Sequence, residues 1–468
     1  MKSSRLSVLA LVAFAVACGA ASNPDVAAKA GDQELSATRL AEVIAHSGAP
    51  LEKDVARNIA ELWVNYQLAG LAAASNDSLS DAKVMQDALW SQIDNIRVKK
   101  FYENVSKGWD SLSPGSDEQR YANGEAFAAR HILVKIDPNS TPEQIGAAKK
   151  KAESILAEAT PANFAALAAK SDEPGAKERG GDLGLFGRGM MVPEFEKCVV
   201  AIKPGEISKE VCQTSFGFHV IYRSPFSDVA DKFAPIAKQR NVAIAESTYL
   251  AKLETSRNVK VEGSAPVKAK AIAKNPLGYI KDNSALATYK GGSLTAARFA
   301  QWVMAYPAQA QIRPQLVAAP DTLVDKFVKQ IVRNELVLQQ ADSAKAQADT
   351  GELQVIFMNF KSDVPRVWAG LDVDPTKLVD SANAKAGKPQ IAAAHVDSFF
   401  SKLVKNEVPF VEIPYPMAHA LQQKYSFSIN EAGLDKAIEQ AKTLRASADS
   451  VKAQAAPTGA TPPDTTRK

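Results

Sequence analysis

The chain has 468 residues, a formal net charge of +4 at pH 7 and 23% charged residues. A chain of this length can form two to four domains with sizeable cores. Its charges are spread without a dense basic block, which argues against nucleic acid as the main partner.

The first residues have the pattern of an export signal. Lys2 and Arg5 precede an apolar run over residues 6–17, which is too short to span a membrane in a mature protein. No later stretch reaches about eighteen apolar residues, so no other segment is expected to cross a bilayer. We therefore expect the protein to be exported.

The end of this run, Ala15-Val16-Ala17-Cys18, resembles a bacterial lipobox. In a lipobox, small residues precede a cysteine that becomes lipid-modified and N-terminal. The resemblance implies a signal peptide over residues 1–18, lipidation of Cys18 and a membrane anchor at the cell envelope. Because Ala15 stands where the lipobox usually has Leu, cleavage without lipidation remains an alternative. Gly19, and not Asp, follows the cysteine. In a two-membrane bacterium this pattern resembles a sorting signal for the outer membrane, where the protein would face the periplasm.

Residues 19–124 are predicted to form a helical module. Ser36 is a natural N-cap for its first amphipathic helix. The apolar helix faces are too broad to stand alone and must pack on another surface. Residues 108–124, rich in Ser, Asp and Gly, are predicted to be a linker. The predicted helices span residues 37–45, 51–74 and 81–107.

The next region, residues 125–226, mixes strand and helix patterns. Residues 130–136 alternate like a strand, and Pro142 suits the first turn of a following helix. These elements predict an α+β domain, a sandwich with one small antiparallel sheet, set between mostly α-helical modules. The remaining predicted elements are helices over residues 142–159 and 164–170 and a strand over residues 217–223.

Several short motifs occur in this region in a definite order. Their order and spacing resemble the parvulin-type (PpiC-type) peptidyl-prolyl cis/trans isomerases, over residues 126–226. The resemblance implies an isomerase, or rotamase, that uses no cofactor and no metal. The motifs are Arg130-His131-Ile132-Leu133-Val134, Gly180-Gly181-Asp182-Leu183-Gly184, Met190-Met191-Val192-Pro193-Glu194-Phe195 and Thr214-Ser215-Phe216-Gly217-Phe218-His219.

The chemistry that this resemblance implies is rotation about an X–Pro amide. Resonance gives the amide bond partial double-bond character and a barrier of about 20 kcal/mol. In the twisted transition state the amide loses conjugation, and its nitrogen becomes a better hydrogen-bond acceptor. A site that holds the proline ring in an apolar pocket, excludes water and offers oriented polar groups therefore binds that state better than either planar isomer.

The resemblance implies which side chains bind the proline ring. Leu183, Met191 and Phe195 fall where the family builds its proline pocket. Phe186 lies close by in sequence and completes the expected substrate-binding set. Met191 and Phe195 are spaced i and i+4 on a short helix expected to start near Pro193, although core residues also produce this spacing.

The resemblance also implies a polar network. His131 and His219 fall on the family's paired core histidines, with Thr214 beside them. Two histidines on neighbouring strands can also simply satisfy each other inside a core. Glu173 falls near the position where the family usually has Cys or Asp, and a difference in loop length leaves the choice between Glu173 and Asp172 open. The expected catalytic set is His131, Glu173, Thr214 and His219.

Cys198 and Cys212 both lie in the same region. In an oxidising compartment they can form one disulfide, but two buried free thiols remain an equal alternative. Neither has a metal-ligand cluster beside it in the sequence.

The rest of the chain, residues 227–450, is predicted to be a second helical module. A short strand is expected over residues 259–261, and residues 263–275 are predicted to be a Pro, Ala and Lys-rich connector. Residues 451–468, rich in Ala, Pro and Thr, are predicted to be disordered. His395 and His419 have no partners at metal-ligand spacing. The expected helices span residues 229–257, 323–342, 353–371, 392–405 and 434–446.

An internal repeat links the two helical modules. Residues 294–303 align without gaps on residues 35–44, and a long apolar helix follows each copy. The alignment predicts duplicated helical units on either side of the isomerase-like region, unless it reflects only chance similarity between amphipathic helices.

An isomerase-like region between helical modules, behind an export signal, resembles the SurA-like chaperones and PrsA-like foldase lipoproteins. The resemblance implies a peptidyl-prolyl isomerase that assists the folding of exported proteins with X–Pro bonds. The main alternative is a holdase whose parvulin domain binds unfolded clients with little or no turnover. A surface adhesin or structural lipoprotein is a third reading, with little in the sequence to favour it.

Overall fold

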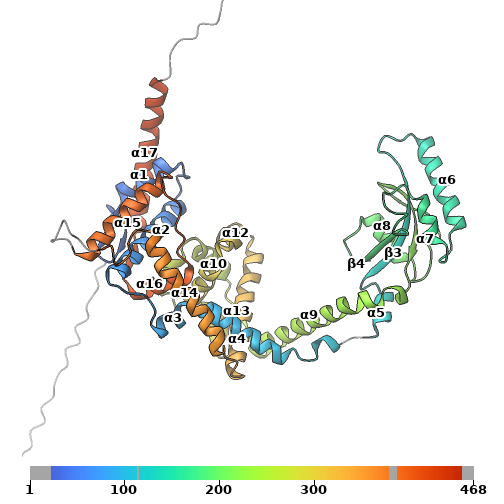
Figure 1. Cartoon of the computed structure of the whole chain (residues 1–468), viewed down its shortest axis with the longest axis horizontal. Helices are drawn as coiled ribbons and strands as arrows, with labels where there is room; N and C mark the ends of the chain where they lie inside the picture. The colour runs from blue at the N-terminus through green and yellow to red at the C-terminus, as the bar shows by residue number, and fades with distance from the viewer. Residues whose placement is uncertain (1–22, 113–114, 379–386, 456–468) are drawn as a thin grey trace, which may run out of the picture. The chain divides into compact units, whose positions relative to one another are not determined.

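The computed structural model describes residues 23–112, 115–378 and 387–455 (Figure 1). The chain forms two compact units. We call residues 102–256 the sheet unit and the described parts of residues 1–101 and 257–468 the helical unit. The two helical modules therefore share one unit, a point that the sequence left open. The predicted span 125–226 lies inside the sheet unit and stays a prediction, and Cys18 with the signal peptide lies outside the described residues.

A four-stranded antiparallel sheet forms the centre of the sheet unit, in the strand order β4-β3-β6-β5. The predicted strands over residues 130–136 and 217–223 are confirmed as the two central strands. The edge strands are too short to show an alternating pattern in the sequence. The strands are β3 (Phe127–Lys135), β4 (Asp182–Phe186), β5 (Cys212–Thr214) and β6 (Gly217–Arg223).

Helices cover both faces of this sheet, and the alternation of side chains along β3 decides which residue meets which helix. Ile132 and Val134 pack in the apolar cluster that contains Ile155 of α6. Ala129 packs on the opposite face, in the cluster that contains Phe195 of α8. The helices are α6 (Pro142–Glu158), α7 (Phe164–Leu167) with the 3-10 turn η2 (Ala168–Lys170), and α8 (Pro193–Ala201).

Part of the predicted linker over residues 108–124 is wrong, because it contains a helix with a buried anchor. Tyr121 of α5 (Asp117–Ala122) is fully buried, and its hydroxyl donates a hydrogen bond to the Ser224 carbonyl at 2.7 Å. Its ring also packs against Phe233 of α9 (Ala230–Ser256). A single buried aromatic residue leaves no periodic pattern, so composition alone suggests a linker. The short turns η1 (Trp109–Ser111) and η3 (Phe226–Asp228) complete the unit.

The helical unit contains the predicted repeat in an extended form. Each copy is a β-hairpin followed by a helix, and Ala28 pairs with Leu35 in one hairpin as Ala287 pairs with Leu294 in the other. The Ser36 side chain caps α1, as predicted, and Thr295 caps α11 in the same way. The paired elements are β1 (Val26–Ala30) with β8 (Ala285–Tyr289), β2 (Gln33–Ser36) with β9 (Gly292–Thr295), α1 (Ala37–Ser47) with α11 (Ala296–Ala305), and α2 (Lys53–Ala74) with α13 (Asp321–Ser343).

A third strand joins each hairpin from outside the aligned segments. β10 (Phe427–Ile429) pairs with β1, and β7 (Lys260–Val261) pairs with β8. A helix follows each third strand, α17 (Glu431–Ala455) after β10 and α10 (Ala265–Lys274) after β7. The duplication therefore includes an element that the alignment of residues 35–44 and 294–303 does not contain.

Three other predictions for the helical unit are wrong. The connector over residues 263–275 contains α10, whose small residues Ala269 and Ala273 are buried. The helix over residues 81–107 is interrupted at Leu89, and the apolar spacing continues across the break. α17 extends to Ala455, past the predicted start of disorder at Val451. The remaining helices are α3 (Ala82–Ala88), α4 (Trp90–Val105), η4 (Pro276–Tyr279), η5 (Ala308–Ala310), α12 (Ile312–Ala318), α14 (Thr350–Gly370), α15 (Lys388–Val404) and α16 (Tyr415–Lys424).

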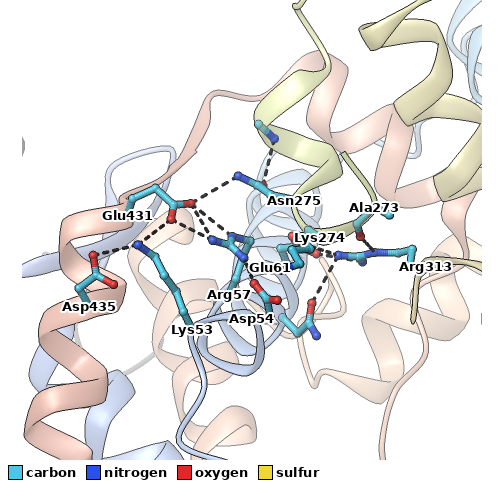
Figure 2. A network of polar contacts seen from close by, with 12 residues as sticks. Lys53, Asp54, Arg57, Glu61, Ala273, Lys274, Asn275, Arg313, Glu431 and Asp435 are labelled. Carbon is cyan, nitrogen blue, oxygen red and sulfur yellow. Dashed lines mark hydrogen bonds and ion pairs between the residues drawn. The ribbon is translucent and has the colours of Figure 1, made fainter. Parts of the chain in front are cut away.

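A network of charged residues joins α2 to α17, α10 and α12 in the helical unit (Figure 2). The Arg57 side chain is 6% exposed and forms ion pairs with Asp54 at 2.6 Å and Glu431 at 2.9 Å. Arg313 donates hydrogen bonds to two carbonyls at the end of α10 and lies 3.6 Å from Glu61. Among the described residues, Glu61 Oε1 is buried without a hydrogen-bond partner.

No helix among the described residues is both long and apolar enough to cross a bilayer.

Candidate active site

Two histidines face each other on the central strands of the sheet unit. In the β3–β6 register His131 pairs with Ile221 and Leu133 pairs with His219, so the two histidines are diagonal neighbours on one face. Their rings are stacked with centroids 5.3 Å apart, and the two Nδ1 atoms are 3.1 Å apart. Both side chains are buried. The pairing that the resemblance implies is therefore present.

The histidines belong to one continuous chain of hydrogen bonds. His131 Nε2 lies 2.5 Å from Glu173 Oε2, and His219 Nε2 lies 2.8 Å from Thr214 Oγ1. At the far end, the Phe216 N–H donates to Thr214 Oγ1 at 3.1 Å. The four residues predicted to be catalytic are thus brought together.

The ionised Glu173 carboxylate determines the direction of every bond in this chain, because it can only accept. His131 must donate from Nε2, which leaves Nδ1 of the neutral ring as an acceptor. His219 then donates from Nδ1, so its Nε2 accepts the Thr214 hydroxyl proton. This tautomer assignment follows from the network, and it partners all four ring nitrogens without placing a charge on either ring.

Burial favours these neutral rings. It lowers the pKa of His219 to about 4, together with the neighbouring His131. Burial also lowers the pKa of His131, although the Glu173 hydrogen bond opposes this change. For Glu173 burial acts to raise the pKa, but the hydrogen bond from His131 and the charge of Arg179 outweigh it and lower the pKa. Near neutral pH the site therefore holds two neutral imidazoles and one carboxylate.

The structure resolves the choice between the two neighbouring carboxylates. Glu173 contacts His131 and forms an ion pair with Arg179 at 2.7 Å. Asp172 instead accepts a hydrogen bond from the Lys135 backbone N–H at 2.9 Å and pairs with Lys151. Asp172 therefore anchors the loop to β3, and Glu173 is the carboxylate of the site.

Apolar side chains line one side of the histidine pair. The Phe195 ring meets both imidazoles edge-on, with centroids 5.6 Å from His131 and 5.2 Å from His219. Leu183 and Met191 are partly buried in the same apolar cluster. Leu183 and Met191 leave apolar surface available beside the polar network, and Phe195, which is 4% exposed, adds little to it.

Two predictions about this wall need correction. Phe186 is 3% exposed and stacks on Phe127, so it supports the wall from inside the core and offers almost no surface to a ligand. Met191 precedes α8, which begins at Pro193, so Met191 and Phe195 do not lie on one helix. The i and i+4 spacing suggests that Met191 and Phe195 share a helix. Pro193 lies between them and is a typical first-turn residue, so the helix begins there and leaves Met191 outside it.

Gly181 brings the pocket segment against β3 beside His131. It has φ of +74°, and an added Cβ would lie 2.5 Å from the His131 carbonyl oxygen. The His131 N–H donates to the Gly181 carbonyl at 2.9 Å. Only glycine fits this approach without displacing the strand.

Sequence reasoning missed Arg179 and Ser171. Arg179 pairs with Glu173, and Ser171 Oγ accepts hydrogen bonds from the backbone N–H groups of Leu133 and Glu173. Arg179 directly precedes the Gly180-Gly181 motif, which is the only sequence signal that points to it. Within the described ranges, no group of three His, Cys, Asp or Glu side chains could hold a metal ion.

The two cysteines of the region form a disulfide, Cys198–Cys212, with Cα atoms 6.2 Å apart. The sequence left a bridge and two free thiols as equal alternatives. The bridge joins α8 to β5, which are the elements that carry Phe195 and Thr214.

Residues 117–224 match the family model described as the PPIC-type PPIASE domain. Foldase protein PrsA of Caldanaerobacter subterraneus subsp. tengcongensis is 35% identical over 179 residues, which are 35% of this chain and 54% of the relative. Peptidyl-prolyl cis-trans isomerase pin1 of Schizosaccharomyces pombe is 33% identical over 29% of this chain and 82% of its own length. Chaperone SurA of Ralstonia nicotianae is 30% identical over 40% of this chain and 33% of its own length. The chain spans about half the length of the PrsA relatives that it matches.

Two solved structures also match part of the chain. Peptidyl-prolyl isomerase ESS1 from Candida albicans is 25% identical, with a TM-score of 0.18, over 26% of this chain and 72% of the other. PrsA from Bacillus subtilis is 22% identical, with a TM-score of 0.19, over 32% of this chain and 54% of the other.

Proposed function

Since the chain belongs to the parvulin-type (PPIC-type) peptidyl-prolyl isomerases, we propose that its sheet unit catalyses cis/trans isomerisation of X–Pro bonds in exported proteins as they fold. The observation that carries this proposal is the continuous hydrogen-bond chain from Thr214 to Glu173, with Phe195 packed edge-on against both histidines. The network supplies oriented polar groups, and the aromatic ring supplies an apolar wall beside them.

In the proposed mechanism the protein binds the twisted amide better than either planar isomer. Leu183 and Met191 hold the proline ring and exclude water from the amide, and the buried Phe195 ring packs against the histidines beside them. Glu173 is the network member whose side chain is 29% exposed, so we assign to it the contact with the peptide. His131, His219 and Thr214 are nearly inaccessible to solvent and hold the carboxylate in position. No covalent bond forms or breaks, and no proton needs to leave the network.

A protease-coupled cis/trans assay on proline tetrapeptides tests this proposal. Uncatalysed isomerisation takes tens of seconds, so modest catalysis is measurable. We expect the chain to accelerate the reaction and Met191→Ala to lower kcat/KM by about tenfold, because one wall of the pocket is removed. The matched control is Met190→Ala, since Met190 is the neighbouring methionine and is 69% exposed. A wild-type rate equal to that of buffer would overturn the proposal, and equal losses in both variants would place the pocket elsewhere.

A second activity, holding unfolded clients, is favoured by an open groove in the helical unit. The groove has a volume of about 980 Å³ and includes Leu62, Val317 and Phe410 in its lining. Phe410 is 61% exposed, which is unusual for a large aromatic side chain. We expect Phe410→Ser to weaken suppression of client aggregation without changing isomerase activity. Val355→Ser is the matched control, because Val355 is similarly exposed at 60% but lies outside this groove.

We further propose that the protein is exported and lipid-anchored at Cys18. The expected site is the outer membrane, where the protein faces the periplasm. The sequence pattern of residues 1–18 supports this proposal. Incorporation of labelled palmitate into the wild-type chain, absent in Cys18→Ala, is the expected result. Export with no label in the wild type would favour cleavage without lipidation.

A further inference from the structure

The disulfide lies inside the candidate active site and not on its periphery. Cys212 pairs directly with His219 in the β5–β6 register. Cys212 is 3% exposed, and both cysteines belong to the apolar cluster that includes Phe195. The bridge is therefore packed against the side chains that form the site.

The bridge joins the two elements that contact His219 from different sides. Phe195 stands one helical turn before Cys198 on α8, and its ring meets His219 edge-on. Thr214 stands two residues after Cys212, on the same face of β5, and its hydroxyl bonds His219 Nε2. One covalent link therefore ties the apolar wall to the polar network.

Apart from the bridge, β5 is held by a short strand pairing, and α8 is held by the packing of Phe195 and Val199 in the apolar cluster. β5 has three residues and lies at the sheet edge, where it pairs only with β6. α8 has nine residues, and a helix of this length has little stability of its own in water. Without the bridge, both elements can shift relative to His219 while the central strands β3 and β6 stay paired.

We propose that the Cys198–Cys212 bridge is a positioning device for the isomerase site, so that oxidation of these two thiols switches the site to its full activity. This inference rests on the isomerase function proposed above. A disulfide donor such as oxidised glutathione supplies the oxidation by thiol–disulfide exchange. The two cysteine thiols lose their protons and two electrons to form one S–S bond, and the donor is reduced to two thiols. The chain is then weakly active in a reducing compartment and fully active in an oxidising one.

The test compares the oxidised chain, the same chain reduced with a phosphine, and the double variant Cys198→Ala/Cys212→Ala. All three carry Cys18→Ser, so that no other thiol takes part. We expect kcat/KM for a proline tetrapeptide to fall about tenfold on reduction and in the double variant, because small displacements of positioned groups are costly to catalysis. In the double variant, kcat/KM should not change when the reductant is added. Hydrogen exchange over β3 and β6 confirms that each form is folded.

A second measurement separates this inference from the isomerase proposal. Binding of a proline peptide and the NMR signals of the His219 ring report on the site without turnover. We expect weaker binding and shifted ring signals in the reduced form. If the oxidised chain shows no catalysis but these changes remain, the isomerase proposal fails and the positioning role stands. If oxidised and reduced chains match in kcat/KM, binding and ring signals, the positioning role is overturned.

Discussion

Two polar networks of this protein handle charge in different ways. In the sheet unit, two neutral histidines connect Thr214 to Glu173, and every ring nitrogen has a partner. In the helical unit, Arg57 and Arg313 pair with carboxylates from distant parts of the chain, and Glu61 Oε1 is left without a partner among the described residues (Figure 2). The comparison teaches that neutral imidazoles can be buried with every ring nitrogen paired, whereas a network of full charges connects more elements but leaves one oxygen unpaired.

Acid provides the strongest test of the neutral network. A histidine in the unfolded chain takes up a proton near pH 6.5, whereas folded His219 does so only near pH 4. The unfolded state therefore binds more protons between these values. The contribution of His219 to the free energy of unfolding is complete above pH 6.5 and is lost as the pH drops toward 4. We expect a loss of about 3 kcal/mol from this residue. Hydrogen exchange of β3 and β6 from pH 7 to pH 4 measures it.

The control for this experiment is His219→Gln, which keeps donor and acceptor groups but does not titrate. Its unfolding free energy should vary less with pH over the same range. Identical pH dependence in the variant and the wild type would show that His219 is not the titrating group.

Removal of one cation tests the charged network. We expect Arg57→Met to destabilise the helical unit by about 2 kcal/mol, because it removes the pairs of this buried cation with Glu431 and Asp54 and leaves Lys53 as the ion-pair partner of Glu431 from α2. Urea unfolding followed by hydrogen exchange in α2 measures the loss. Lys83→Met is the control, because the Lys83 side chain is 81% exposed and solvent screens its pair with Asp87. Isomerase activity should stay unchanged in both variants. A fall in activity with Arg57→Met would contradict the assignment of catalysis to the sheet unit alone.

Substitution of neighbouring carboxylates tests the assignment within the site. We expect Glu173→Gln to lower kcat/KM by about tenfold, or about 1.4 kcal/mol, because the neutral amide no longer fixes the direction of the hydrogen-bond chain. Asp172→Asn should retain activity, since Asp172 bonds the β3 backbone and Lys151 and does not contact the histidines. The reverse order of effects would reassign the carboxylate of the site.

The smallest effect is expected at the unpaired oxygen. Burial raises the pKa of Glu61, against the opposing charges of Arg313 and Arg57. Glu61→Gln should therefore change the unfolding free energy by less than about 1 kcal/mol, in the stabilising direction, because it removes a buried charge that is only half paired. A clear destabilisation in urea unfolding would show that the ion pair with Arg313 outweighs the cost of burial.

The sequence by itself determined the family, the two central strands, most long helices and the histidine pair with Thr214. These features depend on local patterns: apolar periodicity, helix caps such as Ser36, and motifs whose order along the chain is preserved. Tertiary structure alone decided that Glu173 and not Asp172 contacts His131, that Phe186 supports the pocket from behind, and that Cys198 and Cys212 are bridged. It also decided that α10 is a helix with one buried face and that β10 and β7 complete the two hairpins. The physical reason is that these outcomes depend on distances between different segments of the folded chain, and composition and spacing along one segment do not contain those distances.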